Sequence, residues 1–368
     1  MDFYLARNDS LRMLRWARRQ KGVCLLAHPG RDGPGLKMER PSRADILRLD
    51  GELPREVSEA MAGGRVCLHF GARDGKSQSS LARVTPSSVA PDPAAFLEVA
   101  LADGAPLWSQ EGSPDRVFVE GAALSLASCG LDLERRVSSG KMSRAAAVVR
   151  ASAFAMELAG TYCRDPADPI EGEVAYGSDP VGEVCAMEEW LARPRRLVGI
   201  DLARTACSRA ANGAASPMET FWYHAFCMPP RLGGMHFPHP RLNEQLEWPE
   251  VVCGSVCHTS MRPDFLWPAH ALACEYDGST HKEEDAFRQD RERLRDYALC
   301  DVSLLVLTAE DSRDLASVKR ALGQVAALLE RSEPACFSRR VRRNLASDEA
   351  DSARQTLMDQ LLPRRSGS

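Results

Sequence analysis

The spacing of apolar residues is readable at the amino end of the chain and then becomes irregular. Leu11, Leu14 and Ala17 recur at helical intervals, and the same segment carries the basic residues Arg12, Arg15, Arg18, Arg19 and Lys21, so a basic amphipathic helix is predicted there. Residues 25–95 are rich in Gly, Pro, Ser and Arg, with brief apolar runs such as RVCLHF. We expect short elements joined by long loops in this part.

The middle of the chain has a stronger helical pattern. VFVEGAALSLAS predicts a strand, a turn and a helix, and SRAAAVVRASAFAMELAGTYC predicts a second helix with Ser143 as its N-cap and Gly160 near its end. Pro, Asp and Gly interrupt the pattern over residues 164–182. Helix then resumes in GEVCAMEEWLARPRRLVGIDLARTACSRAANG, which ends in a glycine-containing linker.

The last third of the chain alternates between helix and strand patterns. SPMETFWYHAFCM predicts a helix that begins at an N-cap Ser216, and FLW and ALACEY predict two short strands. EEDAFRQDRERLRDYAL predicts an amphipathic helix with Phe287, Leu294 and Ala298 on its apolar side. VSLLVLT follows as a buried strand, and DLASVKRALGQVAALLERS as a final helix. This order predicts an α/β sandwich.

These patterns divide the chain into four parts. We predict an amino-terminal region of mixed α+β structure at 1–105, a mainly helical middle unit at 106–213, an α/β domain at 214–332 and a charged, mobile tail at 333–368. The tail contains the basic run RRVRR, which is interpreted as solvated, with nonspecific phosphate binding as the alternative.

Composition narrows the functional classes. The chain has 368 residues, 44% hydrophobic and 27% charged, with no run of eighteen apolar residues and no leader-like start, so we expect a soluble cytoplasmic protein that does not enter a membrane. Its twelve cysteines are scattered, which favours reduced thiols over a disulfide framework. The net charge of −4 means that any affinity for nucleic acid must come from local basic patches.

Three carboxylates surround the two short strands of MRPDFLWPAHALACEYDGSTH. A two-residue turn at Ala269 and His270 would place Asp264 opposite Glu275, with their Cβ atoms about 5 Å apart. Asp277 would share the face of Glu275 if the second strand extends that far. Phe265, Trp267, Cys274 and Tyr276 would then point the other way, into the core.

Carboxylates that crowd one point repel each other unless one is protonated or a cation lies between them. Clustered oxygen ligands suit a hard divalent ion, so this hairpin predicts a magnesium site. Gly278 permits a turn that would bring His281 towards the acids, where an imidazole could accept a proton from an attacking water. The alternative is a solvent-facing sheet edge with a turn histidine.

The segment 214–312 resembles the very-short-patch repair endonuclease branch of the PD-(D/E)XK nuclease fold, and the bacterial nuclease-like domains of unknown function grouped with it. The resemblance rests on SPMET, RPDFLW, CEYDGSTH, DRERLRD and VSLLVLTAED, which occur in the order of that family. It implies a restriction-endonuclease-like α/β sandwich with a mixed sheet and, from its motif positions, magnesium bound by Asp264 and Glu275. It also implies that Asp277 and His281 complete the site and that Glu219 approaches the metal.

The chain departs from many relatives at one position. Asp277 stands where they have the lysine of the E-x-K motif, so His281 or Lys282 would have to replace it. The resemblance further makes Arg262, Asp290 and Arg293 candidates for supporting the site or contacting phosphate.

Each candidate also has a structural interpretation. Glu219 fits a capping box that returns its side chain to the backbone N–H of Ser216, and Asp290 with Arg293 fits a surface ion pair. Cys253, Cys257 and His258 resemble a zinc motif, but no fourth ligand is evident, so free thiols are favoured over structural zinc.

The sequence therefore predicts a magnesium-dependent DNA endonuclease or nickase, with DNA as its partner. The competing hypothesis is a nuclease-derived module that keeps the fold without catalysis and acts in regulation, defence or an antitoxin-like partnership. The sequence identifies no protein partner.

Overall fold

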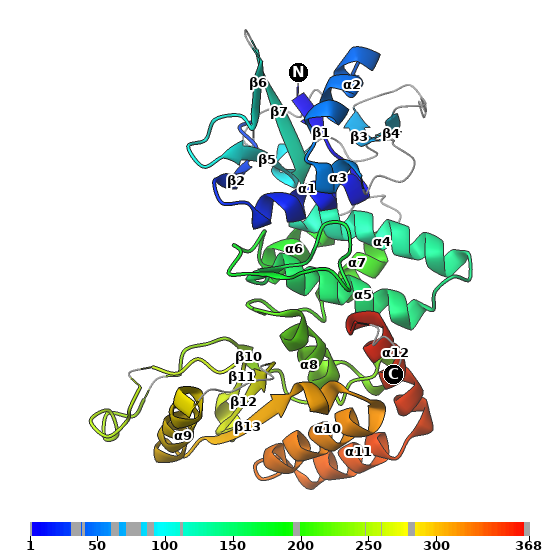
Figure 1. The fold of residues 1–368 in the computed structure, drawn as a ribbon. Coiled ribbons are helices and arrows are strands. Elements are labelled where there is room, and N and C mark those ends of the chain that lie inside the picture. The colour runs from blue at the N-terminus through cyan, green and yellow to red at the C-terminus, as the bar shows by residue number, and fades with distance from the viewer. Residues whose placement is uncertain are drawn as a thin grey trace. The chain divides into compact units, whose positions relative to one another are not determined.

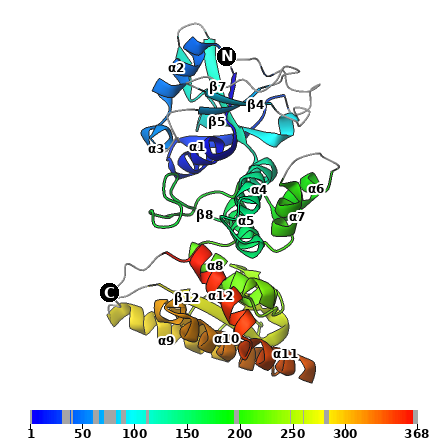
Figure 2. The ribbon, with the colours of Figure 1, turned by 90° about the vertical axis from the view of Figure 1, so that its right-hand side faces the viewer.

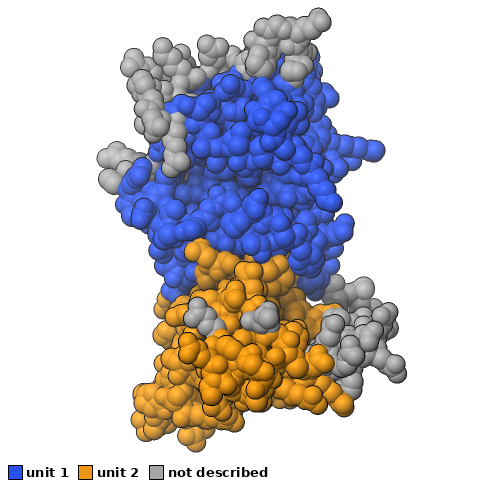
Figure 3. Space-filling model, turned by 90° about the vertical axis from the view of Figure 1, so that its left-hand side faces the viewer, with its two compact units in different colours: residues 1–210, 363–368 blue, residues 211–362 orange. Residues whose placement is uncertain are grey.

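The computed structural model describes residues 2–30, 38, 41–59, 66–70, 82–86, 92–110, 113–193, 199–246, 248–258, 260–278 and 284–363. Within these residues the fold mixes helices with parallel and antiparallel strands, which confirms the α/β class (Figure 1). The chain divides into two compact units, unit 1 with residues 1–210 and 363–368, and unit 2 with residues 211–362 (Figure 3). In the described part, no helix combines the length and apolarity required to cross a bilayer.

Unit 1 is organised around a sheet with the strand order β1-β7-β5-β2, and β6 pairs with β7. The strands are β1 (Asp2–Tyr4), β2 (Val23–Ala27), β5 (Phe96–Leu101), β6 (Trp108–Gln110) and β7 (Ser113–Glu120). β1 lies parallel to β7, whereas β5 is antiparallel to both β2 and β7. Two smaller sheets pair β3 (Val66–Phe70) with β4 (Ala82–Pro86) and β8 (Tyr162–Cys163) with β9 (Ala175–Tyr176).

The helices of unit 1 are α1 (Arg7–Arg19), α2 (Arg43–Glu52), α3 (Arg55–Ser58), α4 (Ala122–Ser138), α5 (Arg144–Leu158), α6 (Val184–Ala192) and α7 (Ile200–Cys207), with the 3-10 turn η1 (Pro93–Ala95). Ser143 caps α5 by accepting the Ala146 N–H, as the sequence predicts. The helices that were predicted to form a separate middle unit belong to the same compact unit as the amino-terminal sheet (Figure 2). β7 links them, because it pairs with β1 and leads directly into α4.

Unit 2 contains a sheet with the order β10-β11-β12-β13. Its strands are β10 (Arg241–Leu242), β11 (Phe265–Trp267), β12 (Leu272–Asp277) and β13 (Ser303–Thr308). Its helices are α8 (Pro217–Cys227), α9 (Glu284–Leu299), α10 (Leu315–Leu329), α11 (Ala335–Leu345) and α12 (Asp348–Leu361), with 3-10 turns η2 (Pro230–Leu232), η3 (Pro268–His270) and η4 (Ala309–Ser312). β10, β11 and β12 are antiparallel, whereas β12 and β13 are parallel.

Helices cover both faces of this sheet. On one face, the ring of Phe226 from α8 lies 5.2 Å from that of Phe265 and 5.4 Å from that of Trp267 between ring centroids. On the other face, Tyr297 from α9 packs in a buried cluster with Leu266 and Ala273. The alternation along β11 therefore places apolar side chains against a helix on either side.

Three predictions for unit 2 are wrong. Residues 333–368 were predicted as a mobile tail, but within the described part of this range Ala335–Leu345 form α11 and Asp348–Leu361 form α12, and Phe337 and Leu357 are buried. β13 was predicted to be buried, but Val306 is 42% exposed, and β13 is the last strand of the sheet in the described residues. Leu294 was predicted on the apolar side of α9, but it is 49% exposed, and Tyr297 takes that place.

Candidate functional site

The β11–β12 hairpin has the predicted register but not the predicted turn. Phe265 pairs with Cys274, and Trp267 pairs with Leu272. The connection is the 3-10 turn η3 followed by Ala271 in the left-handed region at φ 45°, and not a two-residue turn. The register is preserved because the strands pair only over 265–267 and 272–274, which leaves the longer connection outside the ladder.

Asp264 lies directly before β11 and is fixed by the second strand. Its Oδ2 accepts the backbone N–H of Tyr276 at 2.7 Å. Burial raises the pKa of Asp264 to about 7, and the neighbouring carboxylates of Glu219 and Glu275 contribute to the rise. The Asp264 carboxyl is therefore close enough to both glutamates to be influenced by their charge, and it titrates near neutral pH.

Glu275 lies on β12 and contacts two side chains of α9. Its Oε1 accepts hydrogen bonds from Arg293 Nη2 at 2.5 Å and from the Tyr297 hydroxyl at 2.8 Å. Arg293 was predicted to support the site, and it lies in direct contact with Glu275. Tyr297 was not identified from the sequence, although its position four residues after Arg293 places both on one side of the helix.

Glu219 enters from the first turn of α8 and is buried. Its Oε2 accepts the backbone N–H of Ala215 at 2.7 Å and the amide of Asn243 at 2.6 Å. The capping interpretation is thus corrected by one residue, since the side chain reaches Ala215 and not Ser216. Burial raises the pKa of Glu219, although these hydrogen bonds favour its ionised form.

Asn243 connects Glu219 to the start of β11. Its backbone N–H donates to the carbonyl of Asp264 at 3.2 Å, and its own carbonyl accepts a hydrogen bond from Arg262 Nε. It adopts φ 51°, a left-handed conformation that asparagine tolerates better than most residues. The sequence offered a weak signal, because asparagine is common at such turns, but the pairing with Glu219 across 24 residues was not readable.

The remaining predicted site residues are placed to different extents. Asp277 ends β12 opposite Thr308 and is partly buried, and period two puts it on the face of Glu275. His281 and Lys282 lie outside the described residues, as does the side chain of Asp290. The carboxyl of Asp264 therefore lies within electrostatic reach of Glu219 and Glu275, while Arg293 contacts Glu275 and Arg262 contacts Asn243.

The Cys253–His258 segment is tied to α9 by a buried carboxylate. Asp296 accepts the backbone N–H groups of Cys257 and His258 and contacts His258 Nδ1 at 2.7 Å. Among the residues whose placement is described, no three His, Cys, Asp or Glu side chains are grouped as a metal site. A magnesium site would therefore rest on two carboxylates with other oxygen ligands, which is a common arrangement for this ion.

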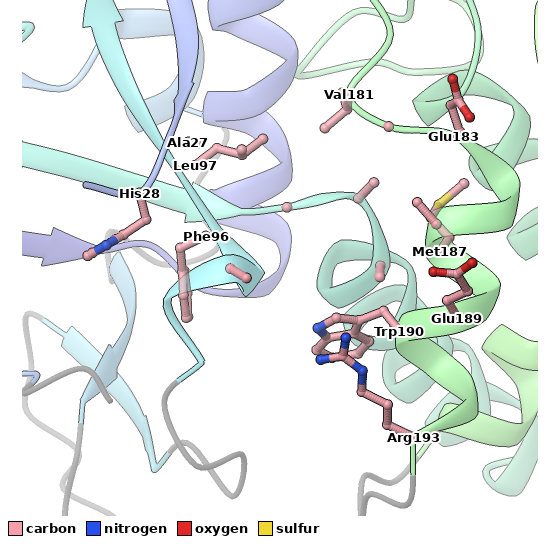
Figure 4. Close-up of a pocket in the computed structure, with 16 residues that line it drawn as sticks. Ala27, His28, Phe96, Leu97, Val181, Glu183, Met187, Glu189, Trp190 and Arg193 are labelled. Atoms are coloured by element: carbon pink, nitrogen blue, oxygen red, sulfur yellow. The ribbon is translucent and has the colours of Figure 1, made fainter. Parts of the chain in front are cut away.

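A separate cavity of about 350 Å³ lies in unit 1, and its lining includes His28 and Phe96 together with Met187 and Trp190 of α6 (Figure 4). None of the site residues predicted from the sequence lines it. Its aromatic and charged groups come from segments far apart in the chain, so their spacing gave no signal.

Comparison of the chain with models of known protein families, with curated proteins and with solved structures finds no match.

Proposed function

We propose that unit 2 is a divalent-metal-dependent DNA endonuclease or nickase with a restriction-endonuclease-like fold, similar to the very-short-patch repair branch. The observation that carries this proposal is the carboxyl of Asp264, whose pKa is raised to about 7 beside Glu219 and Glu275. Acids that disfavour each other's ionisation are typical of sites that bind a cation or move a proton.

The donor atoms suit a magnesium ion. Asp264 uses Oδ2 for the Tyr276 N–H, and Glu275 uses Oε1 for Arg293 and Tyr297. Within the described residues this leaves Oδ1 of Asp264 and Oε2 of Glu275 as ligands. Magnesium is commonly held by one or two carboxylates together with water and phosphate oxygens.

The neighbouring residues have separate roles in this proposal. Tyr297 and Arg293 orient Glu275, and Asn243 positions Glu219 close to Asp264. A bound magnesium ion would supply activated water and stabilise the charge that develops on the phosphate. His281, which lies outside the described residues, would serve as the base of the site in place of the lysine that many members of the resembled family have.

A non-catalytic nuclease-fold module is the second candidate, as a binding or regulatory protein in defence or an antitoxin-like partnership. The contact between Glu275 and Arg293 favours it, because this guanidinium already supplies a positive charge where a metal would act. Asp277 in place of the lysine favours it as well.

Incubation of supercoiled plasmid with magnesium tests these candidates. The enzyme should relax or linearise plasmid, and chelator or the substitution Asp264→Asn should abolish this. Asp201→Asn serves as the matched control, because Asp201 is an exposed aspartate of unit 1. Equal cleavage by Asp264→Asn would assign the activity to another site, and an inactive wild-type protein that still binds DNA would favour the module.

A further inference from the structure

Helix α11 divides sharply into a buried side and a basic side. Phe337, Val341 and Asn344 are buried. At 100° per residue, Arg339, Arg342 and Arg343 lie on the opposite side of the helix, and Arg340 lies at the edge of the buried side; all four arginines are exposed. The run RRVRR therefore belongs to a packed helix beside α10 (Figure 1), and not to a mobile tail.

The charges on this surface are not neutralised within the described part of the chain. Arg340 donates to the backbone carbonyl of His236 at 3.0 Å and stacks over the ring of Phe337, with its Cζ 5.2 Å from the centroid. Arg342 has only a long bond to the Ser338 carbonyl of its own helix. None of the four guanidinium groups lies in an ion pair with a described carboxylate, whereas Asp351 on α12 is already paired with Lys319 and Arg354.

Such an arrangement costs stability in the free protein. Like charges three and four residues apart on a helix repel each other by a few tenths of a kcal/mol per pair. The buried side of α11 holds the helix despite this repulsion. An anionic partner would remove the repulsion and gain charge-assisted hydrogen bonds.

We propose that the exposed face of α11, formed by Arg339, Arg342 and Arg343, binds the phosphate backbone of DNA. The choice of DNA rests on the proposed function, but the binding itself needs neither metal nor catalysis. Guanidinium groups bind phosphate oxygens in pairs of hydrogen bonds, which suits this composition. A membrane surface is disfavoured, because an interfacial helix must insert its apolar side, and that side of α11 is buried in the protein.

The test compares two triple substitutions that remove the same charge. The first is Arg339→Gln, Arg342→Gln and Arg343→Gln, which leaves Arg340 to hold the His236 carbonyl. The matched control is Arg55→Gln, Arg204→Gln and Arg313→Gln, three arginines that already pair with carboxylates. Both are made in full-length Asp264→Asn protein and measured without magnesium by fluorescence anisotropy on a labelled 30-base-pair duplex at several KCl concentrations.

The α11 variant should bind more weakly, and the slope of log K against log salt should become shallower by about 2 to 3, since each lost phosphate contact contributes about 0.9. The control should keep the slope of its parent. Equal slopes for both triple variants would overturn the proposal, as would no binding by the parent protein. If polyglutamate competed as effectively as unlabelled DNA at equal charge, the proposal would be overturned in favour of an acidic protein partner. If the protein bound phosphatidylserine vesicles through α11 and did not bind DNA, it would be overturned in favour of a membrane.

The two proposals fail separately. If the wild-type protein cleaves plasmid but the α11 variant binds DNA like its control, the α11 proposal is wrong and the endonuclease proposal stands. If the α11 variant has a shallower slope of log K against log salt but the wild-type protein does not cleave plasmid, the α11 proposal stands and the endonuclease proposal is wrong.

Discussion

Asp264 combines two demands that conflict in the free protein. Its Oδ2 accepts the Tyr276 N–H and so ties the start of β11 to β12, while the same carboxyl lies near two other acids. The pKa near 7 follows from burial together with this crowding. Removal of the negative charge should therefore stabilise the protein in the absence of metal.

The pH dependence of stability follows from the sign of this shift. The folded-state pKa of about 7 exceeds the ordinary value of 3.8, so the folded protein holds a proton that the unfolded chain releases between about pH 4 and pH 7. The stability of the wild-type protein should fall as pH rises through this window. Asp264→Asn keeps an acceptor for the Tyr276 N–H and should be more stable than wild type at pH 8 by about 1–3 kcal/mol.

Urea unfolding of both proteins at pH 5, 6, 7 and 8 with chelator measures this difference. The advantage of Asp264→Asn should grow with pH and be smallest at pH 5. A difference that is constant across these pH values would show that Asp264 does not titrate in this range.

At the scale of elements, the sequence predicted features that depend on residues close together in the chain, and it did not predict features that depend on contacts with distant residues. Ser143 and Ser216 cap the predicted helices because capping depends on residues three positions apart. The predicted hairpin register is confirmed, although it was derived from a two-residue turn that is wrong. The actual turn was not predictable, because Ala271 adopts a left-handed conformation that its residue type does not indicate.

Burial within elements was harder to predict. In α11, Phe337 and Val341 are four residues apart, but the surrounding arginines made the segment resemble a solvated tail. In α9, Asp296 is fully buried because it accepts bonds from the Cys257–His258 backbone, and no periodicity of apolar residues reveals such a partner. Of the candidate site, the acids were identifiable from their motif, whereas Asn243 and Tyr297 depended on contacts between separate elements.

The crossing of α4 and α7 gives a prediction about packing. A Cβ added at Gly130 of α4 would lie 2.5 Å from the carbonyl oxygen of Gly199, which is closer than van der Waals contact allows. Gly130→Ala should therefore force the two helices apart and destabilise unit 1 by about 1–3 kcal/mol. Gly51→Ala is the control, because a Cβ at this position of α2 meets no atom within 4 Å and alanine favours helix.

Thermal unfolding by circular dichroism measures both variants. Gly130→Ala should melt below the wild-type protein, and Gly51→Ala at or slightly above it. An unchanged melting temperature for Gly130→Ala would mean that the helices separate without loss of packing.

At the scale of the whole molecule, each unit has a core of its own. The sheet of unit 1 buries Val99, Val117 and Val119, and that of unit 2 buries Phe265 and Trp267. β1 and β7 pair although more than a hundred residues separate them in the chain, so the boundary of unit 1 depends on a contact that no local pattern predicts. Because the chain divides into two compact units, each with its own core, we expect two unfolding transitions.

Magnesium should act on one of these transitions. An ion that binds only the folded site raises the stability of the unit that contains it, by about 2.7 kcal/mol at a hundredfold excess over its Kd. Differential scanning calorimetry of the full chain with and without magnesium should show one transition moving upward. Gly130→Ala identifies the other transition as that of unit 1, because it lowers that transition alone.

The proton on Asp264 makes the magnesium effect depend on pH. Metal binding requires the ionised carboxylate, so the upward shift should be larger at pH 8 than at pH 6, on either side of the pKa of about 7. Asp264→Asn, which lacks the carboxylate repulsion, should have a higher transition temperature without magnesium, and magnesium should raise that temperature only slightly. If magnesium instead moved the transition of unit 1, or moved that of unit 2 equally in Asp264→Asn, the carboxylates of the β11–β12 hairpin would not be the metal ligands, and the acid cluster would have to act without one.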